Sequence, residues 1–157
     1  MRKKLTKRII HSVQKSWAEG ILKISHAYRN NEEYKNIAEE FIYRHYGYEE
    51  GLVLFKPTLV SKEQFRETFE KAHSYFVAGN PNFPEDKGFA IQPWKKIKFR
   101  NAGIVIIESR AVAMGNYFFS HENGKVIKVE YTFGYFMNKY DEIKIHLHHS
   151  SIPYSTG

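Results

Sequence analysis

The order of two hydrophobic patterns along this chain constrains its fold more than any other feature. In the first half, apolar residues recur every three or four positions, which is the spacing of one face of a helix. In the second half, apolar and polar residues alternate, as in strands whose successive side chains point to opposite faces. Helices followed by strands predict an α+β domain with helices packed on one face of a strongly curved antiparallel sheet.

Two helices are expected at the start of the chain. The first carries an apolar stripe from Ile10 to Tyr28. Asn30 followed three residues later by Glu33 has the form of a capping box, and it predicts a second helix that ends near Gly47.

A short strand and a third helix are expected next. The apolar run Leu52–Phe55 predicts a buried strand that Pro57 stops. Ser61–Gln64 has the form of another capping box, so a third helix is expected with Phe65–Phe76 along its buried stripe and its end near Gly79.

Strands are expected over the rest of the chain. Turn residues at Glu122–Gly124 and Asn138–Asp141 separate the last three strands, which predicts an antiparallel meander. Gly103, Gly115 and Gly134 interrupt strand patterns and are expected at bulges or bends. The predicted strands are Phe89–Gln92, Lys95–Arg100, Ile104–Glu108, Ala111–Ser120, Lys125–Met137 and Glu142–Ser150.

Composition limits the class of protein. With 157 residues, 42% of them hydrophobic, a single domain over 1–157 is expected, with N-terminal helices in 1–50 and a core in 52–154. The absence of cysteine excludes disulfides, thiolate zinc sites and cysteine nucleophiles. The apolar runs are too short to cross a bilayer and no signal-peptide pattern is present, so a cytoplasmic protein without a membrane partner is expected.

The formal net charge of +7 does not by itself predict a nucleic-acid partner. Positive charge is dense only in Arg2–Arg8 and Lys95–Arg100, and the second segment alternates with Ile97 and Phe99 as a solvated strand face does. We therefore expect no nucleic-acid binding, although a basic protein still attracts small anions.

The polar end of the last strand is the first candidate for a functional site. Alternation puts His146, His148 and Ser150 on one strand face and His149 on the other. His146 and His148 would suit Zn or Mn, but no third ligand stands at a recognisable spacing. Hydrogen bonding within a polar pocket is the more common role of such histidines, so the metal site is kept as an alternative.

Several segments resemble known families. The order of elements is similar to the cone-like nuclear transport factor 2-like (SnoaL-like) fold, and 148–153 resembles the closing motif of the calcium/calmodulin-dependent kinase II association domain. Other segments between 52 and 154 resemble iota-class carbonic anhydrases: Phe55–Thr58, Ser74–Val77, Glu85–Trp94, Asn101–Gly103, Ala113–Phe119 and Lys128–Tyr135.

This resemblance implies a homodimeric carbonate dehydratase, a lyase that interconverts CO2 and bicarbonate, and at least one branch of that family works without a bound metal. In that branch, hydroxyl groups at positions matching Thr58, Tyr75 and Ser150 contact the substrate, and all three are present here. No cofactor is then expected. His148 is expected to support substrate binding from the strand face of Ser150.

The chemistry needs a water close to the CO2 carbon and donors for the charge that develops on oxygen. Thr58 and Ser150 can hold an oxygen, while Tyr75 can orient the water or relay its proton. A phenol has an ordinary pKa of about 10 and is a poor base at neutral pH, so either a proton chain or a lowered pKa is required.

Two other classes of function stay open. The His-His-Ser-Ser segment that ends the last strand would equally suit a non-catalytic oligomerisation module. A cyclase or isomerase would need a buried carboxylate base, for which Glu108, Glu130 and Asp141 are the candidates. Aromatic residues on both faces of the meander predict a dimer interface on the outer face of the sheet.

Overall fold

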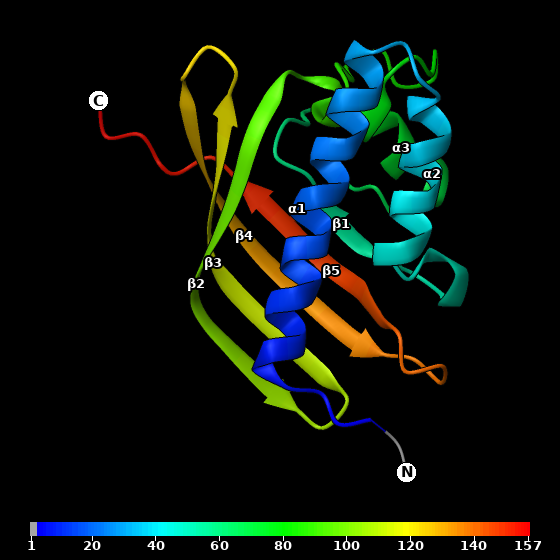
Figure 1. The fold of residues 1–157 in the computed structure, drawn as a ribbon, viewed down its shortest axis with the longest axis vertical. Coiled ribbons are helices and arrows are strands. Elements are labelled where there is room, and N and C mark those ends of the chain that lie inside the picture. Colours follow the sequence, from blue (N-terminus) through cyan, green and yellow to red (C-terminus); the bar gives the residue numbers. More distant parts are fainter. Residues whose placement is uncertain (1–2) are drawn as a thin grey trace.

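The computed structural model describes residues 3–157 and confirms the α+β architecture, with helices on one face of a curved sheet (Figure 1). The sheet has the order β1-β5-β4-β3-β2, in which β1 runs parallel to β5 and the other pairs are antiparallel. The elements are α1 (Lys7–Arg29), α2 (Tyr34–His45), η1 (Tyr48–Glu50), β1 (Leu54–Lys56), α3 (Phe69–Val77), η2 (Phe89–Ile91), β2 (Trp94–Ile107), β3 (Arg110–His121), β4 (Val126–Met137) and β5 (Ile143–Ser151).

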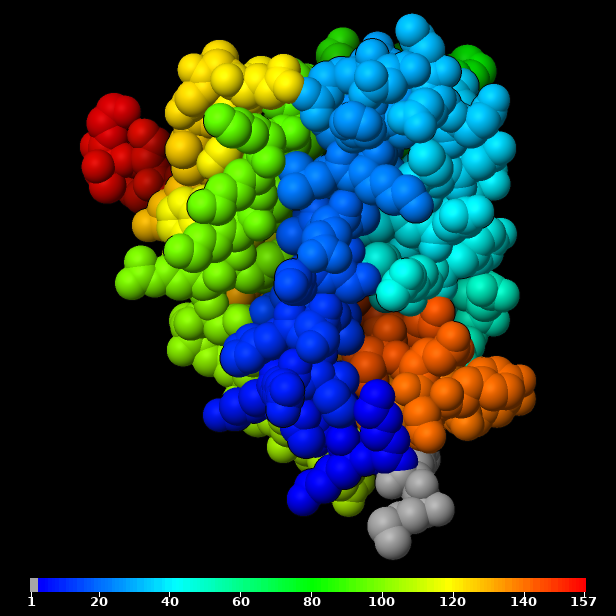
Figure 2. All heavy atoms as spheres, viewed as in Figure 1, coloured from blue at the N-terminus to red at the C-terminus, as the bar shows by residue number. Residues whose placement is uncertain are grey.

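Helix α1 covers the middle of the sheet, and Figure 2 shows it as a ridge between β2 and α2. Its Trp17 is 2% exposed and lies at the centre of an aromatic core. The rings around Trp17 come from helices and strands alike: Phe41, Phe99, Tyr117, Phe119, Phe133 and His148. Buried aromatic rings contribute much of a core's stability, so α1 and the sheet are held as one layered unit.

Two of the three register shifts in the sheet lie beside glycines, as the glycine pattern predicts, and the third lies between Trp94 and Lys96. Of the two shifts beside glycines, one lies between Asn101 and Gly103 and the other beside Gly134. The segments predicted as two strands on either side of Asn101 are therefore one bent strand, β2. Gly115 lies opposite this bulge, where a Cβ atom would collide with the carbonyl oxygen of Arg100.

Both predicted capping boxes are wrong. Asn30 instead ends α1, where its side-chain amide donates to the carbonyl of His26 at 2.8 Å. Helix α2 begins after Glu33 without a side-chain cap. Helix α3 is capped by Thr68, whose hydroxyl accepts from the backbone N–H of Lys71.

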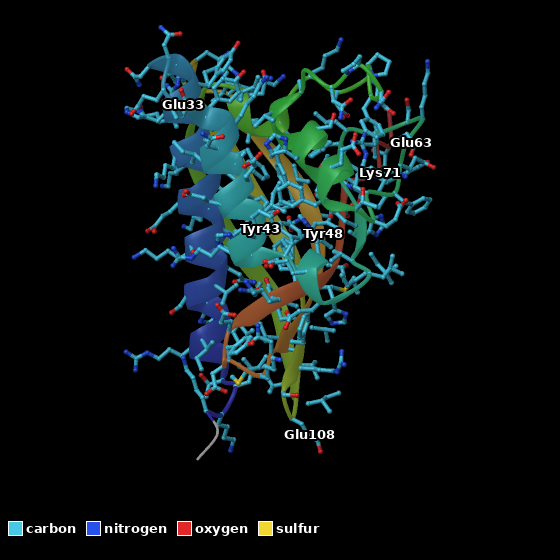
Figure 3. The ribbon with its side chains drawn as sticks, turned by 90° about the vertical axis from the view of Figure 1, so that its right-hand side faces the viewer. Glu33, Tyr43, Tyr48, Glu63, Lys71 and Glu108 are labelled. Carbon is cyan, nitrogen blue, oxygen red and sulfur yellow. The ribbon has the colours of Figure 1, made fainter. Side chains whose placement is uncertain are left out.

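Residues around Ser61 form no helix because a carboxylate from another loop binds their backbone. Glu85 accepts from the N–H groups of Ser61, Lys62 and Glu63 at 2.8, 3.1 and 2.7 Å. These bonds lower the pKa of Glu85 to about 2. Figure 3 shows the loop with Glu63 beside α3, where its carboxylate lies 3.3 Å from the Lys71 ammonium.

Two expected strands differ from prediction. Strand β1 is short and half exposed, because Val53 and Phe55 are buried while Leu52 and Leu54 face solvent. The expected strand Phe89–Gln92 is the 3-10 turn η2, which follows a left-handed glycine at Gly88. No helix within 3–157 is long and apolar enough to cross a membrane.

Candidate active site

The structure brings the three predicted hydroxyl residues together at one end of the sheet. Strand β1 pairs in parallel with β5, so the chain leaving β1 at Thr58 runs beside the end of β5 at Ser150. The Oγ1 atom of Thr58 lies 2.6 Å from the Oγ atom of Ser150. Tyr75, in the last turn of α3, accepts from the backbone N–H of Leu59 at 3.2 Å.

A chain of hydrogen bonds leads from this group across the core. The hydroxyl of Tyr117 lies 2.5 Å from Ser150 Oγ and 3.1 Å from His148 Nε2. On the other side of the imidazole, Nδ1 of His148 lies 2.9 Å from the hydroxyl of Tyr46. Tyr46 in turn accepts from the indole N–H of Trp17 at 3.1 Å. The chain therefore joins α1 to the end of β5.

Counting donors and acceptors gives these hydrogen bonds one direction in which the buried proton of Tyr46 has an acceptor. Burial lowers the pKa of His148 well below its usual range, so its imidazole is neutral. The Trp17 indole donates to the Tyr46 oxygen, and Nδ1 of His148 is then the acceptor within reach of the Tyr46 proton. His148 then carries its proton on Nε2 and donates to Tyr117. Tyr117 in turn donates to Ser150.

The last protons of the chain belong to Ser150 and Thr58. Because Ser150 accepts from Tyr117, its own proton goes to Thr58. The Thr58 proton is then the end of the chain, next to Tyr75. This arrangement leaves two hydroxyl groups, those of Thr58 and Tyr75, with protons to offer to a substrate.

The phenols of the site are neutral. Burial raises the pKa of Tyr46, Tyr75 and Tyr117 above the ordinary value. For Tyr75, the N–H of Leu59 and the hydroxyl of Thr58 offset only part of this effect. The sequence analysis required either a proton chain or a tyrosine with a lowered pKa. The structure contains a hydrogen-bonded chain, and the pKa of none of these three tyrosines is lowered.

The hydroxyl groups line a small space in the aromatic core, which we call the inner cavity. Its volume is about 10 Å³, enough for one water molecule, and Phe55 and Phe76 are among its apolar walls. A wider outer pocket of about 520 Å³ opens beside it toward the β3–β4 turn. Thr58, Tyr75 and Phe89 line both spaces, so they stand between the inner cavity and the outer pocket.

His146 lies apart from this site, and its predicted pairing with His148 on one face is wrong. The register shift beside Gly134 breaks the alternation of β5, so His146 packs against Phe136 on the outer face, with ring centres 5.6 Å apart. His148 faces the core instead. Within 3–157, no group of three or more His, Asp or Glu side chains is arranged to hold a metal ion.

The three carboxylates proposed as a base also lie elsewhere. Glu108 is in the turn between β2 and β3, which Figure 3 places at the opposite end of the molecule from Glu33. Glu130 accepts from the hydroxyl of Ser151, and Asp141 lies in the β4–β5 turn. None of the three lines the inner cavity or the outer pocket.

Sequence reasoning missed three members of the hydrogen-bonded chain, Trp17, Tyr46 and Tyr117. Tyr117 stands two residues before Phe119, so alternation along β3 places both rings on the core face. The alternation of β3 is therefore enough to predict that Tyr117 faces the core. Trp17 and Tyr46 meet His148 only through tertiary packing, and no local pattern marks them.

Comparisons with known proteins agree on one family. The family model described as metal-independent carbonic anhydrase matches residues 8–152. A protein of Nostoc sp. (strain PCC 7120 / SAG 25.82 / UTEX 2576) named metal-independent carbonic anhydrase is 39% identical over 153 residues, which are 96% of this chain and 75% of that protein.

Solved structures give the same result. The crystal structure of a cyanobacterial iota-carbonic anhydrase complexed with bicarbonate has a TM-score of 0.96 and 37% identity, covering 99% of this chain and 97% of that one. A kinase II association domain from Xanthomonas campestris has a TM-score of 0.61 and 20% identity, covering 95% and 89% of the two chains. At 20% identity the second likeness shows the fold alone, which two structures described as nuclear transport factor 2-like share at TM-scores of 0.56 and 0.54.

Proposed function

This chain belongs to the metal-independent carbonic anhydrase family, and we propose that it hydrates CO2 reversibly to bicarbonate where the inner cavity meets the outer pocket. The observation that carries the proposal is the meeting of Thr58, Tyr75 and Ser150 around a space for one water molecule. The bicarbonate complex of a cyanobacterial relative with the same fold supports the substrate.

The direction of the hydrogen bonds suggests a role for each hydroxyl. As water attacks the carbon of CO2, negative charge develops on the CO2 oxygens. Thr58 and Tyr75 have protons to donate to those oxygens, and one such donor is worth ~2.7–4 kcal/mol in other enzymes. Ser150 keeps a lone pair that can accept from the attacking water and aim it at the carbon.

The walls of the site suit both forms of the substrate. Phe55, Phe76 and Phe89 give CO2 an apolar surface, and they strengthen hydrogen bonds by keeping bulk water out. The outer pocket carries Lys87 and Lys125, whose positive charges attract the bicarbonate anion. CO2 thus meets apolar side chains beside the inner cavity, and bicarbonate meets positive charge in the outer pocket.

We propose that no metal takes part in the reaction. His148, the imidazole nearest the hydroxyl groups, has both ring nitrogens engaged, with Tyr46 and Tyr117. A histidine ligand must present a free nitrogen lone pair to a metal, so His148 does not fit that role. The name of the family supports the same proposal.

The outer sheet face suits a second copy of the chain, and we propose a homodimer built on it. Val105, Ile107, Val112 and Met114 are exposed side by side on β2 and β3, by 46–66%. Such a patch is unusual on a monomer. In analytical ultracentrifugation we expect the wild type to sediment as a dimer and the Met114→Glu variant as a monomer. A monomeric wild type would contradict the proposal.

Substitution of the hydroxyl groups tests the function. In a stopped-flow assay of CO2 hydration, Ser150→Ala and Tyr75→Phe are each expected to lose roughly 100- to 1000-fold in kcat. Ser151→Ala is the matched control, because the Ser151 hydroxyl bonds Glu130 on the other face of the sheet. Full activity in Ser150→Ala would contradict this site, and an inactive wild type would favour the oligomerisation module.

A further inference from the structure

Hydration of CO2 releases a proton, and the inner cavity holds no group suited to exchange it with solvent at neutral pH. Burial raises the pKa of Tyr75 and Tyr117 and lowers that of His148. The aliphatic hydroxyls of Thr58 and Ser150 do not titrate in this range. The proton must therefore pass to a group outside the inner cavity.

One group in the outer pocket is placed for this task. His121, the last residue of β3, lines that pocket together with Thr58 and Tyr75. Its Nδ1 atom is buried and, alone among buried side-chain nitrogens and oxygens in the described part of the chain, has no hydrogen-bond partner. Buried polar atoms without a partner are rare in folded proteins, so this one calls for an explanation.

The position of the His121 ring is well defined. It packs edge-on against Trp94, with ring centres 5.7 Å apart. The backbone N–H of His121 donates to the carbonyl of Lys125 at 2.8 Å, which fixes the start of the β3–β4 turn. The side chain as a whole is only partly buried, so it links the enclosed end of the outer pocket to solvent.

We propose that His121 is the proton-transfer residue of this enzyme, an inference that rests on the proposed carbonic anhydrase activity. In hydration, a C–O bond forms between water and CO2 and one O–H bond of that water breaks. The released proton passes to Ser150 Oγ as Ser150 gives its own proton to Thr58 and Thr58 gives its proton to pocket water. The pocket water delivers a proton to Nδ1 of His121, and the imidazole then gives a proton to solvent buffer. Dehydration of bicarbonate runs the same transfers in reverse.

Imidazole suits this step because one ring nitrogen can take up a proton while the other gives one up. The other charged groups near His121 do not. The Glu85 carboxylate, with a pKa of about 2, is held by backbone N–H groups. Lys87 and Lys125 are ordinarily cations without a free lone pair. Glu122, the next residue after His121, is paired with Arg29.

The test compares His121→Gln with His11→Gln, an exposed histidine on α1 outside the outer pocket. In dilute buffer without imidazole, kcat of His121→Gln is expected to fall on the order of 100-fold, while kcat/KM for CO2 is retained. Added imidazole buffer is expected to restore kcat of His121→Gln and to leave His11→Gln unchanged. His121→Ala is measured in parallel, with melting curves for every variant.

Two results would overturn the proposal. One is full kcat of both His121 variants in dilute buffer. The other is a lowered kcat that imidazole does not restore in a variant that melts like the wild type. An inactive wild type would instead contradict the proposed function itself, so the two failures are distinguishable.

Discussion

The site combines groups that are all neutral at pH 7, so the position of each proton matters more than charge. The indole of Trp17 can only donate, and the hydrogen bonds from Tyr46 to Thr58 then run in the direction that leaves the Tyr46 proton with an acceptor. The resemblance carried by short motifs predicts Thr58, Tyr75 and Ser150 as site residues, and the structure places these three around one cavity. The resemblance does not predict Tyr46, because the pairing of Tyr46 with His148 joins segments 102 residues apart.

The Tyr117→Phe substitution tests the hydrogen-bonded chain that runs from Trp17 to Thr58, because Tyr117 lies in the middle of it. The change removes the acceptor of His148 Nε2 and the donor to Ser150, so we expect kcat to fall at least about 10-fold and stability to fall by about 1–3 kcal/mol. Tyr131→Phe is the matched control, since that buried tyrosine bonds Asn101 outside the inner cavity. Stopped-flow rates and urea unfolding separate the two effects. Equal activity in Tyr117→Phe and Tyr131→Phe would contradict a role of these hydrogen bonds in catalysis.

Among the elements, Thr58 lies just after β1 and Tyr75 lies in α3, and a buried ion pair connects the two segments. Arg66 is fully buried and pairs with both oxygens of Asp86 at 2.8 and 2.7 Å. Its backbone N–H donates to the carbonyl of Phe55 in β1, while Ser74 in α3 donates to Asp86 at 2.6 Å. This arrangement positions Thr58 and Tyr75 relative to each other.

The elements also show where sequence patterns fail. The long strands and α1 were predictable because their apolar periodicity is sustained over many residues. The capping box at Ser61 was misleading because the carboxylate of Glu85, from a distant loop, binds the same N–H groups. The bulge in β5 put His146 and His148 on different faces, and strict alternation cannot foresee a bulge.

Asp86→Asn tests the anchoring of these elements. It removes the closer of the two carboxylates that face the buried Arg66 guanidinium and leaves only Glu85, at 4.0 Å, so we expect a loss of about 3–5 kcal/mol in the free energy of unfolding. Glu63→Gln breaks an exposed pair with Lys71 and is expected to cost less than about 1 kcal/mol. Urea unfolding measures both. A cost for Asp86→Asn as small as that of Glu63→Gln would show that the buried pair does not anchor the loop.

For the molecule as a whole, buried neutral histidines make stability depend on pH. Burial lowers the pKa of His45 to about 4 from the ordinary 6.5. Between these values the unfolded chain binds a proton that the folded chain does not, so stability falls as pH drops from 6.5 to 4, by about 3 kcal/mol for this residue. The lowered pKa of His148 acts in the same direction.

His45→Gln is expected to flatten this dependence. Urea unfolding at pH 6.5 and pH 4 measures it, with His11→Gln as the exposed control. The difference in stability between the two pH values should shrink by about 3 kcal/mol in His45→Gln and stay unchanged in His11→Gln. An unchanged difference in His45→Gln would mean that His45 takes up its proton in the folded state as readily as in the unfolded one.

Catalysis of CO2 hydration without a metal is the central claim about the whole molecule. The most direct measurement is the stopped-flow hydration rate of wild-type protein stripped with a chelator, with its metal content checked by mass spectrometry. We expect a rate far above the uncatalysed one that chelation leaves unchanged and that added Zn²⁺ or Mn²⁺ does not raise. A rate that falls to the uncatalysed value on chelation and returns with either ion would contradict the claim.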